Sequence, residues 1–370
     1  MSSIPDHTFY ENQSLCRISG SPQKYSTLQE FRAGSSLYRS KGKKVFQKNT
    51  GRKIPDPWHA ANEKLLSLLK QVCNEFKGLT GQLTGHSLIR ERWTSLNTER
   101  TRLETIWGSF RGSDFWDITF SGSPGRALQY RTGLWENWSV DLPACSEFKN
   151  YPVHFSPYCS TLLHEAVGHA LEHEYLRDSP LLPNIGSRFC TDELTVMDHP
   201  EMPGLAGSMK YDDTGQPATE TTLIHRGCLV GDLDSKKGVW RRGSFKSLPL
   251  IRATNFVIKK GSADPKDWLR FLPDQYYVAW INQGKWLPGT QYIAVHTGPV
   301  FRIRNGEPVG FFKSLKLEYH SVDFLKAIQA VGHDLQLDPM LHWCFKDGQG
   351  IPMSLISPSL LVDNCFQRSG

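Results

Sequence analysis

The sequence contains no two cysteines separated by two residues, although it has eight cysteines in 370 residues. The eight are spread over positions 16, 73, 145, 159, 190, 228, 344 and 365. The lack of CxxC spacing argues against a structural zinc ribbon, whose ligands come in such pairs. The wide spacing in a long chain also argues against the disulfide framework of small secreted domains. A metal site in this chain must therefore draw on residues that are far apart in sequence.

Long apolar runs are also missing. No stretch approaches the roughly 20 apolar residues that a membrane span needs, and the opening segment MSSIPDHTFYENQS lacks the charged and apolar regions of a secretory signal. Hydrophobic residues make up 39% of the chain, which is enough for a buried core and argues against disorder. No repeat period of a solenoid or propeller occurs. We therefore expect a folded, cytoplasmic protein with no membrane partner.

Basic residues are concentrated in one place. The net charge is +6, and the segment 39–53, RSKGKKVFQKNTGRK, carries seven Lys or Arg and no acidic residue. Such a segment is typical of a solvated loop, but it also suits contact with an acidic partner. No nucleic-acid-binding module accompanies it. We therefore do not expect a nucleic-acid partner, although the function of this segment stays open.

The first half of the chain is typical of an α+β domain, which we place at 1–153. Residues 1–54 lack sustained periodicity and are interpreted as loop-rich. Apolar residues at helical spacing predict an amphipathic helix over 58–78. Residues 98–153 show alternating apolar and polar residues, are rich in aromatic residues, and are interrupted by glycines. This pattern predicts antiparallel strands packed on that helix.

The second half, 154–370, is expected to be a mainly antiparallel β domain that follows a metal-binding helix. Turn signals at 213–215 and 225–227 predict a β-meander. Further strands are expected at 276–281, 290–297 and 299–304, with a turn at Asn305 and Gly306. One more helix is expected at 322–335, where Phe324, Leu325, Ile328 and Val331 recur on one side.

The stretch LLHEAVGHALEHEYL, residues 162–176, contains two histidines, His164 and His169, five positions apart. In the zinc-protease pattern HExxH the two histidines are four apart and share one helix face. On a regular helix a spacing of five is a rotation of about 500°, so the two rings would lie roughly 140° apart. A π-type bulge would bring them back to one face, and Gly168 gives the backbone freedom for it. The alternative is a polar surface helix with two ordinary histidines.

A catalytic zinc site usually has three protein ligands and an open position for water. Residues of suitable chemistry occur downstream of the two histidines, and spacing does not choose among them. They are Glu174, Cys190, Glu193, His199, Cys228 and Cys344.

Four motifs in order closely resemble the TldD/PmbA family (modulator of DNA gyrase) of metallopeptidases. LLHEAVGHALE resembles its His-Glu-x-x-x-His signature, and RRGSFKSLPLIRATNF (241–256), HDLQLDP (333–339) and CFKDGQG (344–350) resemble three later motifs. The resemblance covers roughly 155–365. It implies that His164, His169 and Cys344 bind Zn²⁺ and that Glu165 is the general base. The presence of all four residues favours the catalytic, TldD-like branch over the non-catalytic one.

The resemblance implies a zinc-dependent peptidase or amidase acting on unfolded or small modified peptides, as in the maturation of a peptide natural product. The tetrahedral intermediate of amide hydrolysis needs a cationic or N–H partner. Arg241, Arg242 and Arg252 are candidates, although each suits a structural ion pair equally well. Glu172 matches a family glutamate and either orients a histidine or is solvated. The resemblance also implies a homodimer or a heterodimer with a related subunit.

The sequence departs from the family pattern in three respects. The region before the motif is short, and little of 1–150 matches. Trp280 and Trp286 stand where small residues are expected, which either reshapes the peptide groove or fills the core; we prefer the core. His173 replaces a glycine and is interpreted as an exposed histidine. These departures keep open a tailoring hydrolase that acts on a small-molecule amide, and a non-catalytic partner subunit that has kept the metal.

Overall fold

The structure is a computed structural model of the chain. It describes residues 7–21, 24–38, 45–48, 80–94, 98–111, 117–122, 129–131, 133, 138, 142–176, 179, 181, 186–234, 236, 237, 239–244, 246–286 and 292–368. Strands predominate and helices are short, so the predicted α+β class with mainly antiparallel pairing is confirmed. The predicted domain boundary between residues 153 and 154 stays a prediction.

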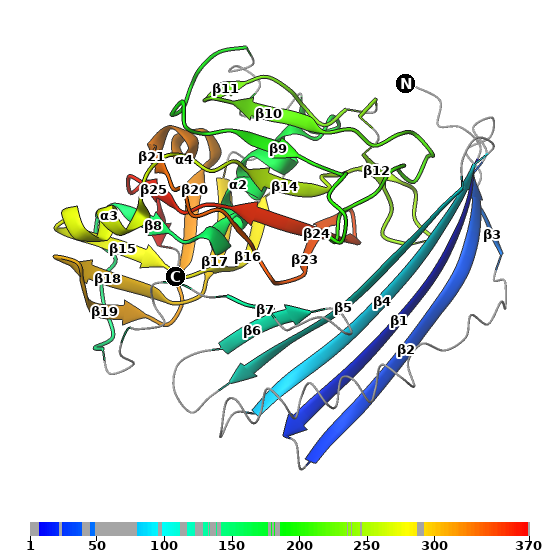
Figure 1. The fold of residues 1–370 in the computed structure, drawn as a ribbon, viewed down its shortest axis with the longest axis horizontal. Helices are drawn as coiled ribbons and strands as arrows, with labels where there is room; N and C mark the ends of the chain where they lie inside the picture. The colour runs from blue at the N-terminus through cyan, green and yellow to red at the C-terminus, as the bar shows by residue number, and fades with distance from the viewer. Residues whose placement is uncertain are drawn as a thin grey trace.

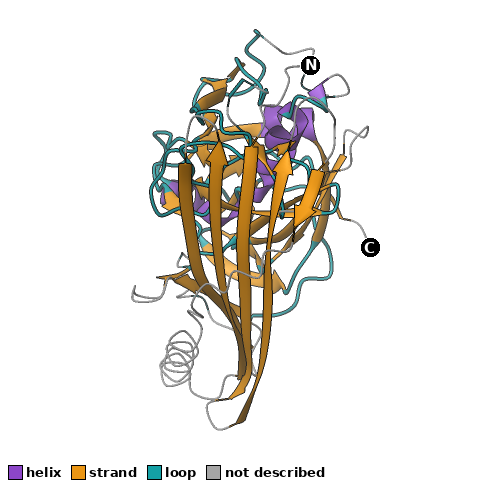
Figure 2. Cartoon of the chain, turned by 90° about the vertical axis from the view of Figure 1, so that its right-hand side faces the viewer, coloured by secondary structure: helices purple, strands orange, loops and turns teal. Residues whose placement is uncertain are grey.

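Seven of the described strands form one antiparallel sheet from the first part of the chain, in the order β3-β2-β1-β4-β5-β6-β7. It curves along one side of the molecule, and its long strands run side by side (Figures 1 and 2). The strands are β1 (His7–Ser21), β2 (Lys24–Tyr38), β3 (Val45–Lys48), β4 (Thr80–Thr94), β5 (Thr98–Arg111), β6 (Asp117–Gly122) and β7 (Gln129–Tyr130).

The expectation of a loop-rich segment at 1–54 is wrong, because β1, β2 and β3 lie within it. β1 pairs with β2 on one side and with β4 on the other, and β4 is distant in sequence. Such pairing supplies backbone hydrogen bonds that local periodicity does not reveal. Strands expected within 98–153 are confirmed by β5 and β6. The helix expected at 58–78 lies outside the described residues.

The remaining strands form the body of the molecule in several smaller sheets (Figure 1). The largest has the order β11-β10-β9-β14-β24-β22, with β23 also pairing with β24. Its strands are β9 (Val196–Asp198), β10 (Thr221–His225), β11 (Cys228–Leu229), β14 (Asn255–Ile258), β22 (Gln336–Leu337), β23 (His342–Lys346) and β24 (Gln349–Ser357). A short ribbon, β12 (Trp240–Arg241) with β13 (Leu250–Ile251), lies apart from these sheets.

Two further sheets complete the body. One has the order β19-β18-β15-β8-β25-β21 and the other the order β16-β17-β20-β26. Their strands are β8 (Val153–Phe155), β15 (Asp274–Val278), β16 (Ile281–Trp286), β17 (Tyr292–Thr297), β18 (Val300–Arg304), β19 (Glu307–Phe312), β20 (Lys316–His320), β21 (Ile328–Val331), β25 (Leu360–Val362) and β26 (Gln367–Arg368). The pairs β8/β15 and β14/β24 are parallel, and all other pairs between these named strands are antiparallel.

Two hairpin turns form as predicted. Arg226 and Gly227 join β10 to β11, and Asn305 and Gly306 join β18 to β19. Both residues of each turn have positive φ, which is what a two-residue hairpin loop of the I′ type requires. The turn expected around 213–215 is flanked only by an isolated bridge between Tyr211 and Pro217, so the meander is shorter than expected.

The helix expected at 322–335 is too long. Helix α4 (Ser321–Ala327) ends before β21, and β21 pairs with β25. Ile328 and Val331 are buried, but they are buried in a strand. Their spacing of three suits a helix face, and only the distant partner strand decides between the two structures. Another short helix, α3 (Pro265–Phe271), begins after the N-cap residue Asp264.

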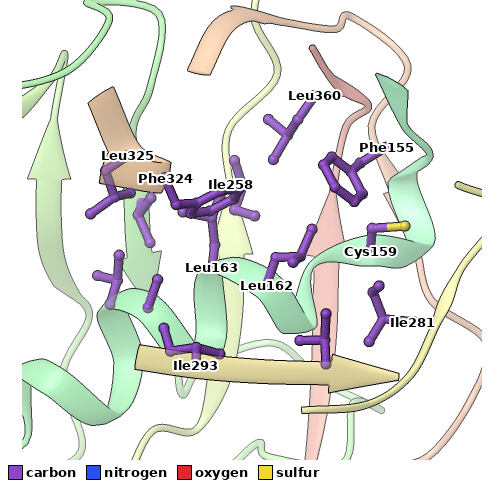
Figure 3. Packing of buried hydrophobic residues seen from close by; sticks show 14 of the residues in the cluster. Phe155, Cys159, Leu162, Leu163, Ile258, Ile281, Ile293, Phe324, Leu325 and Leu360 are labelled. Atoms are coloured by element: carbon purple, nitrogen blue, oxygen red, sulfur yellow. The ribbon is translucent and has the colours of Figure 1, made fainter. Parts of the chain in front are cut away.

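The helical segment that carries the two histidines lies inside the body. It follows a single 3₁₀ turn, Pro157–Cys159, and consists of α2 (Thr161–Leu163), a π-helical turn (His164–Gly168) and a 3₁₀ turn (His169–Leu171). Leu162 and Leu163 have no exposed surface and pack among side chains from several sheets (Figure 3). The alternative of a surface helix is therefore excluded, and the polar residues of this segment are held inside the core.

Within the described residues, no helix has the length and apolar character needed to cross a membrane.

Candidate metal centre

The five-residue spacing of the histidines is accommodated by a π-helical turn, as predicted. The backbone N–H of His169 donates to the carbonyl oxygen of His164, which is the i to i+5 bond of a π-helix. The two imidazole rings consequently lie on one face, with their centroids 4.8 Å apart. Gly168 fits this turn because a Cβ there would lie 2.9 Å from His164 Nδ1. The glycine leaves room for the ring of His164.

Cys344 completes the cluster from β23. Its Sγ lies 3.3 Å from Nε2 of His169, and one ligand atom from each of His164, His169 and Cys344 lies within 4.8 Å of the other two. All three side chains are buried. Among the described residues this is the one set of three or more His, Cys, Asp or Glu side chains close enough to hold a metal ion.

The other candidate third ligands lie elsewhere. Glu174 accepts a hydrogen bond from Lys346, and Glu193 accepts from Ser262 and the backbone of Val331. Cys190 contacts the carbonyl oxygen of Gly227. His199 lies 3.3 Å from Glu220, and Cys228 belongs to the hairpin strand β11. None of them belongs to the cluster found in the described part of the chain.

The residues present fit a zinc ion. Both ring nitrogens of His164 are buried and have no hydrogen-bond partner among the described residues, and a buried, unpaired polar atom is costly unless something binds it. A metal would take one of these lone pairs. Two imidazoles and a thiolate are ligands that zinc prefers, and ligand atoms of a tetrahedral site lie roughly 3.5 Å apart. The distance of 3.3 Å between Cys344 Sγ and His169 Nε2 agrees with this value, and all three ligand atoms lie within 4.8 Å of one another.

The electrostatics also single out Cys344. Burial raises the pKa of its thiol, but the positive charges of His169, Arg252 and His164 outweigh burial and hold the pKa well below the ordinary value. The thiolate, which is the metal-binding form, therefore prevails. By contrast, burial raises the pKa of Cys159, Cys190 and Cys365 to about 12.

A buried carboxylate orients His169. Oε1 of Glu172 lies 3.2 Å from His169 Nδ1, and the side chain of Glu172 is fully buried. With Nδ1 directed to the carboxylate, Nε2 points to the cluster, an arrangement typical of histidine metal ligands. Glu172 also accepts a hydrogen bond of 2.7 Å from Lys346 Nζ. Burial raises the pKa of Glu172, but His169, Lys346 and Arg252 lower it overall to about 2.

Glu165 lies in the same π-helical turn, 7% exposed, and lines a cavity of about 760 Å³. His164, His169 and Cys344 line the same cavity, so the carboxylate shares this space with the three candidate ligands. Gly284 of β16 packs directly on it: a Cβ at Gly284 would lie 2.6 Å from Glu165 Cγ.

Two strands border the cavity. Residues 282–286 of β16 lie on one side and residues 342–346 of β23 on another. Among the described strands, β16 pairs only with β17 and β23 pairs only with β24. Each strand therefore has an edge without a partner strand in the described structure. An unpaired strand edge presents backbone N–H and C=O groups that can pair with an extended chain.

The two tryptophans have different positions. Trp280 is buried away from the cavity lining and donates to Asn282 Oδ1, so the core interpretation is confirmed for it. Trp286 lines the cavity, and its ring is nearly parallel to that of His169 at a centroid distance of 6.3 Å. Trp286 therefore shapes the wall beside a candidate ligand. His173 is exposed, as expected, with 60% of its side-chain surface accessible.

The three arginines are buried and do not line the cavity. Arg241 donates to the carbonyl oxygens of Ala253 and Pro352, at 2.6 Å each. Arg242 bonds Asp213 through its backbone N–H and its guanidinium. Arg252 donates to the carbonyl oxygen of Cys344. These are contacts that hold the backbone around the site, and the catalytic role of Arg241 and Arg242 stays a prediction without support from their positions.

The sequence profile of the PmbA/TldA metallopeptidase C-terminal domain matches residues 149–366. This range is more than half of the chain and contains the whole cluster. The chain belongs to the PmbA/TldD family. The family assignment made from the four motifs is confirmed.

Similar proteins that are named as metalloproteases are consistent with this family assignment. The chain is 28% identical over 221 residues to a metalloprotease TldD homologue of Buchnera aphidicola, covering 56% of this chain and 46% of the relative. It is 26% identical over 229 residues to a zinc metalloprotease TldD homologue of Saccharolobus solfataricus, covering 57% of this chain and 50% of the relative. The chain thus spans about half the length of the relatives it matches.

The fold also has a solved counterpart. TldE of Thermococcus kodakarensis superposes with a TM-score of 0.69 at 16% identity, covering 99% of this chain and 97% of TldE. At this identity the likeness establishes the fold of the PmbA/TldD chain and nothing about its activity.

Several residues around the site were not recognised from the sequence. Lys346 lies in the motif CFKDGQG and Asp338 in the motif HDLQLDP. Membership of these motifs was the one sequence feature that could have indicated a role at the site. Arg131 contacts Asp338 and carries no local signal, because the two residues are 207 positions apart. His342 lies only four positions after Asp338, but it falls outside the quoted motifs.

Proposed function

We propose that this PmbA/TldD-family chain is a zinc-dependent peptidase that hydrolyses amide bonds of extended peptides. One observation carries the proposal. His164, His169 and Cys344 offer three zinc-type ligand atoms within 4.8 Å of one another, and Glu165 lines the same cavity.

In this proposal His164, His169 and Cys344 hold the zinc ion. The ion, when bound, supplies Lewis acidity that lowers the pKa of a water molecule and polarises a substrate carbonyl. Glu165 is the general base: its carboxylate accepts a proton from the attacking water and delivers it to the nitrogen of the leaving amine. Glu172 keeps the imidazole of His169 oriented, and Trp286 forms part of the cavity wall beside that ring.

The unpaired edge of β16 favours an extended peptide as substrate. A peptide pairing with the free edge of residues 282–286 would lie in the cavity that Glu165 and the three candidate ligands also line. Small or modified peptides, including precursors of peptide natural products, suit such a groove. A small-molecule amide is the alternative, and the dependence of turnover on peptide length distinguishes the two.

We further propose that the chain works as a dimer, either with itself or with a related subunit. The ground for this proposal is the resemblance of the four motifs to the TldD/PmbA family, which implies a pairwise assembly. Size-exclusion chromatography with light scattering on the purified chain tests the homodimer directly.

The proposal is tested by elemental analysis of the purified protein beside His169→Ala, Cys344→Ala and the control Cys190→Ala. We expect about one zinc per chain in the wild type and the control, and none in the other two variants. A peptide pool is then incubated with the wild type, Glu165→Gln and chelated protein. Hydrolysis by the wild type alone supports the proposal, and zinc binding without hydrolysis would favour a partner subunit that has kept the metal.

A further inference from the structure

A third histidine, His342 of β23, lines the cavity beside His164 and His169. His342 and Cys344 are two positions apart in this strand, and side chains at that spacing point to the same side. His342 lines the cavity, and 17% of its side-chain surface is exposed. The rise of a strand places the two residues about 7 Å apart along β23.

The ring of His342 is held by a buried carboxylate. Nε2 of His342 lies 2.9 Å from Oδ2 of Asp338, which is fully buried. Asp338 accepts three more hydrogen bonds, from Nε and Nη2 of Arg131, at 2.9 and 2.7 Å, and from the backbone N–H of Met340. An ionised carboxylate only accepts hydrogen bonds, so Nε2 of His342 carries the hydrogen.

Arg131 anchors this carboxylate from a distant part of the chain. It directly follows β7, the last strand of the curved sheet. Its guanidinium forms a two-pronged pair with Asp338, and its Cζ lies 5.9 Å from the ring centre of Tyr158 and 5.8 Å from that of Trp280. The bidentate pair and the two neighbouring aromatic rings fix the orientation of the Arg131 guanidinium. They therefore fix the orientation of the Asp338 carboxylate, whose charge the guanidinium compensates.

The other ring nitrogen of His342, Nδ1, has no hydrogen-bond partner among the described residues. With Nε2 protonated, Nδ1 of the neutral ring is an acceptor. An extended peptide advances about 3.4 Å per residue, so a separation of about 7 Å from Cys344 corresponds to two substrate residues.

We propose that His342 is a substrate-binding residue whose Nδ1 accepts a backbone N–H of the peptide about two residues from the bond that is hydrolysed, and that Asp338 and Arg131 are its positioning residues. This inference rests on the proposed peptidase function for the nature of the ligand. It adds a contact that fixes the position of the peptide relative to the metal centre, and Arg131, at the end of the curved sheet, supports that contact from behind the cavity lining.

The test measures binding, so that it does not depend on turnover. The probe is a library of random dodecapeptides, enriched on immobilised, zinc-loaded Glu165→Gln protein. For an enriched peptide, each backbone amide is replaced in turn by an ester, which removes one N–H. We expect one ester to weaken binding to Glu165→Gln about tenfold, the effect of one lost hydrogen bond. The same ester should have less than a twofold effect on Glu165→Gln/His342→Phe.

The matched control is Glu165→Gln/His296→Phe, which makes the same substitution on the exposed side of β17 and should respond like Glu165→Gln. Zinc content and melting temperature should be equal in all three proteins. Asp338→Asn in the same background should reproduce the loss seen with His342→Phe; if that variant does not fold, the phenylalanine variant alone decides.

Two outcomes overturn the inference: enrichment of no peptide, or ester effects that are the same with and without His342. If one ester effect disappears with His342→Phe but the wild type cleaves no peptide, the binding role stands and the proposed peptidase function fails.

Discussion

The backbone N–H of His169 donates to the carbonyl oxygen of His164, five residues earlier. This single bond widens the helix by one residue and turns two histidines that a regular helix would separate toward one another. Their rings then meet the sulfur of Cys344, a residue of β23 that lies 175 positions after His169 in the chain. The unusual spacing of the motif is therefore a requirement of the site.

Replacing Gly168 by alanine should weaken zinc binding. The new Cβ would lie 2.9 Å from Nδ1 and 3.3 Å from Cε1 of His164, so the ring of His164 has to move. We expect the zinc affinity to fall at least tenfold, since one of three protein ligands is displaced. Competition with a zinc-binding dye measures this affinity, and an unchanged value would show that the ring is not a ligand in this position.

Replacing Gly284 by alanine should reduce hydrolysis and leave zinc bound. Its Cβ would lie 2.6 Å from Cγ of Glu165 and 2.7 Å from Cγ2 of Thr161, and neither residue is a candidate ligand. Either β16 or the carboxylate has to shift, and a displacement near 1 Å can cost about 100-fold in rate. Zinc analysis and peptide turnover on the same preparation test this, and loss of zinc would contradict it.

Glu172→Gln should weaken zinc binding more than Glu174→Gln does. Both glutamates accept a hydrogen bond from Lys346, but only Glu172 contacts His169. Loss of a carboxylate behind a metal-binding histidine typically lowers metal affinity about 10- to 100-fold. The same dye competition measures both variants, and equal effects would mean that the charge on Lys346, rather than the orientation of His169, is what matters.

Arg131→Gln should destabilise the protein in a pH-dependent way. Burial raises the pKa of Asp338, but Arg131 and His342 lower it well below the ordinary range. A carboxyl with a depressed folded-state pKa stabilises the fold fully above its unfolded pKa, about 3.9. This contribution begins to decrease below that value and is lost as the pH falls through the folded-state pKa. Breaking such a buried pair costs about 3–5 kcal/mol.

Urea unfolding at pH 7 and at pH 3.5 measures the free energy of unfolding of wild type and Arg131→Gln. The difference should be large at pH 7 and smaller at pH 3.5. Arg304→Gln is the control, because Arg304 is half exposed and pairs with Asp274 at the surface, and its loss should cost about 1 kcal/mol or less. A difference that does not change with pH would show that Arg131 acts through packing alone.

Arg241→Lys should lower the melting temperature. Its two guanidinium nitrogens donate to the carbonyl oxygens of Ala253 and Pro352, and a lysine cannot reach both. The expected cost is about 2 kcal/mol, which calorimetry detects. Slower hydrolysis at an unchanged melting temperature would instead favour the catalytic role suggested by the motif.

The metal cluster was predictable because its parts carry local or motif signals. Histidines five apart with Gly168 between them indicated a π-helical turn, and the match of CFKDGQG to a known motif selected Cys344 among six candidate ligands. The alternation in 98–111 and the turn residues Asn305 and Gly306 likewise indicated β5 and the hairpin of β18 and β19.

Other features depended on partners that are distant in sequence. β1 and β2 show little periodicity, and their pairing with each other and with β4 makes them strands. Ile328 and Val331 suit a helix face as well as a strand, and pairing with β25 decided the outcome. The arginines of the 241–256 motif were candidates either for the reaction centre or for structural ion pairs. Their guanidinium groups donate to backbone carbonyl groups, and none of the three lines the cavity.

The sequence by itself determined the candidate metal ligands, the proposed acid–base residue and the local backbone freedom that lets His164 and His169 share a face. The tertiary structure alone decided which groups surround that chemistry. The carboxylate of Asp338, which orients His342, is buried, and a buried negative charge needs a positive partner. That partner is Arg131, which follows the last strand of another sheet. Contacts of this kind depend on distances between segments far apart in the chain, and no local pattern encodes them.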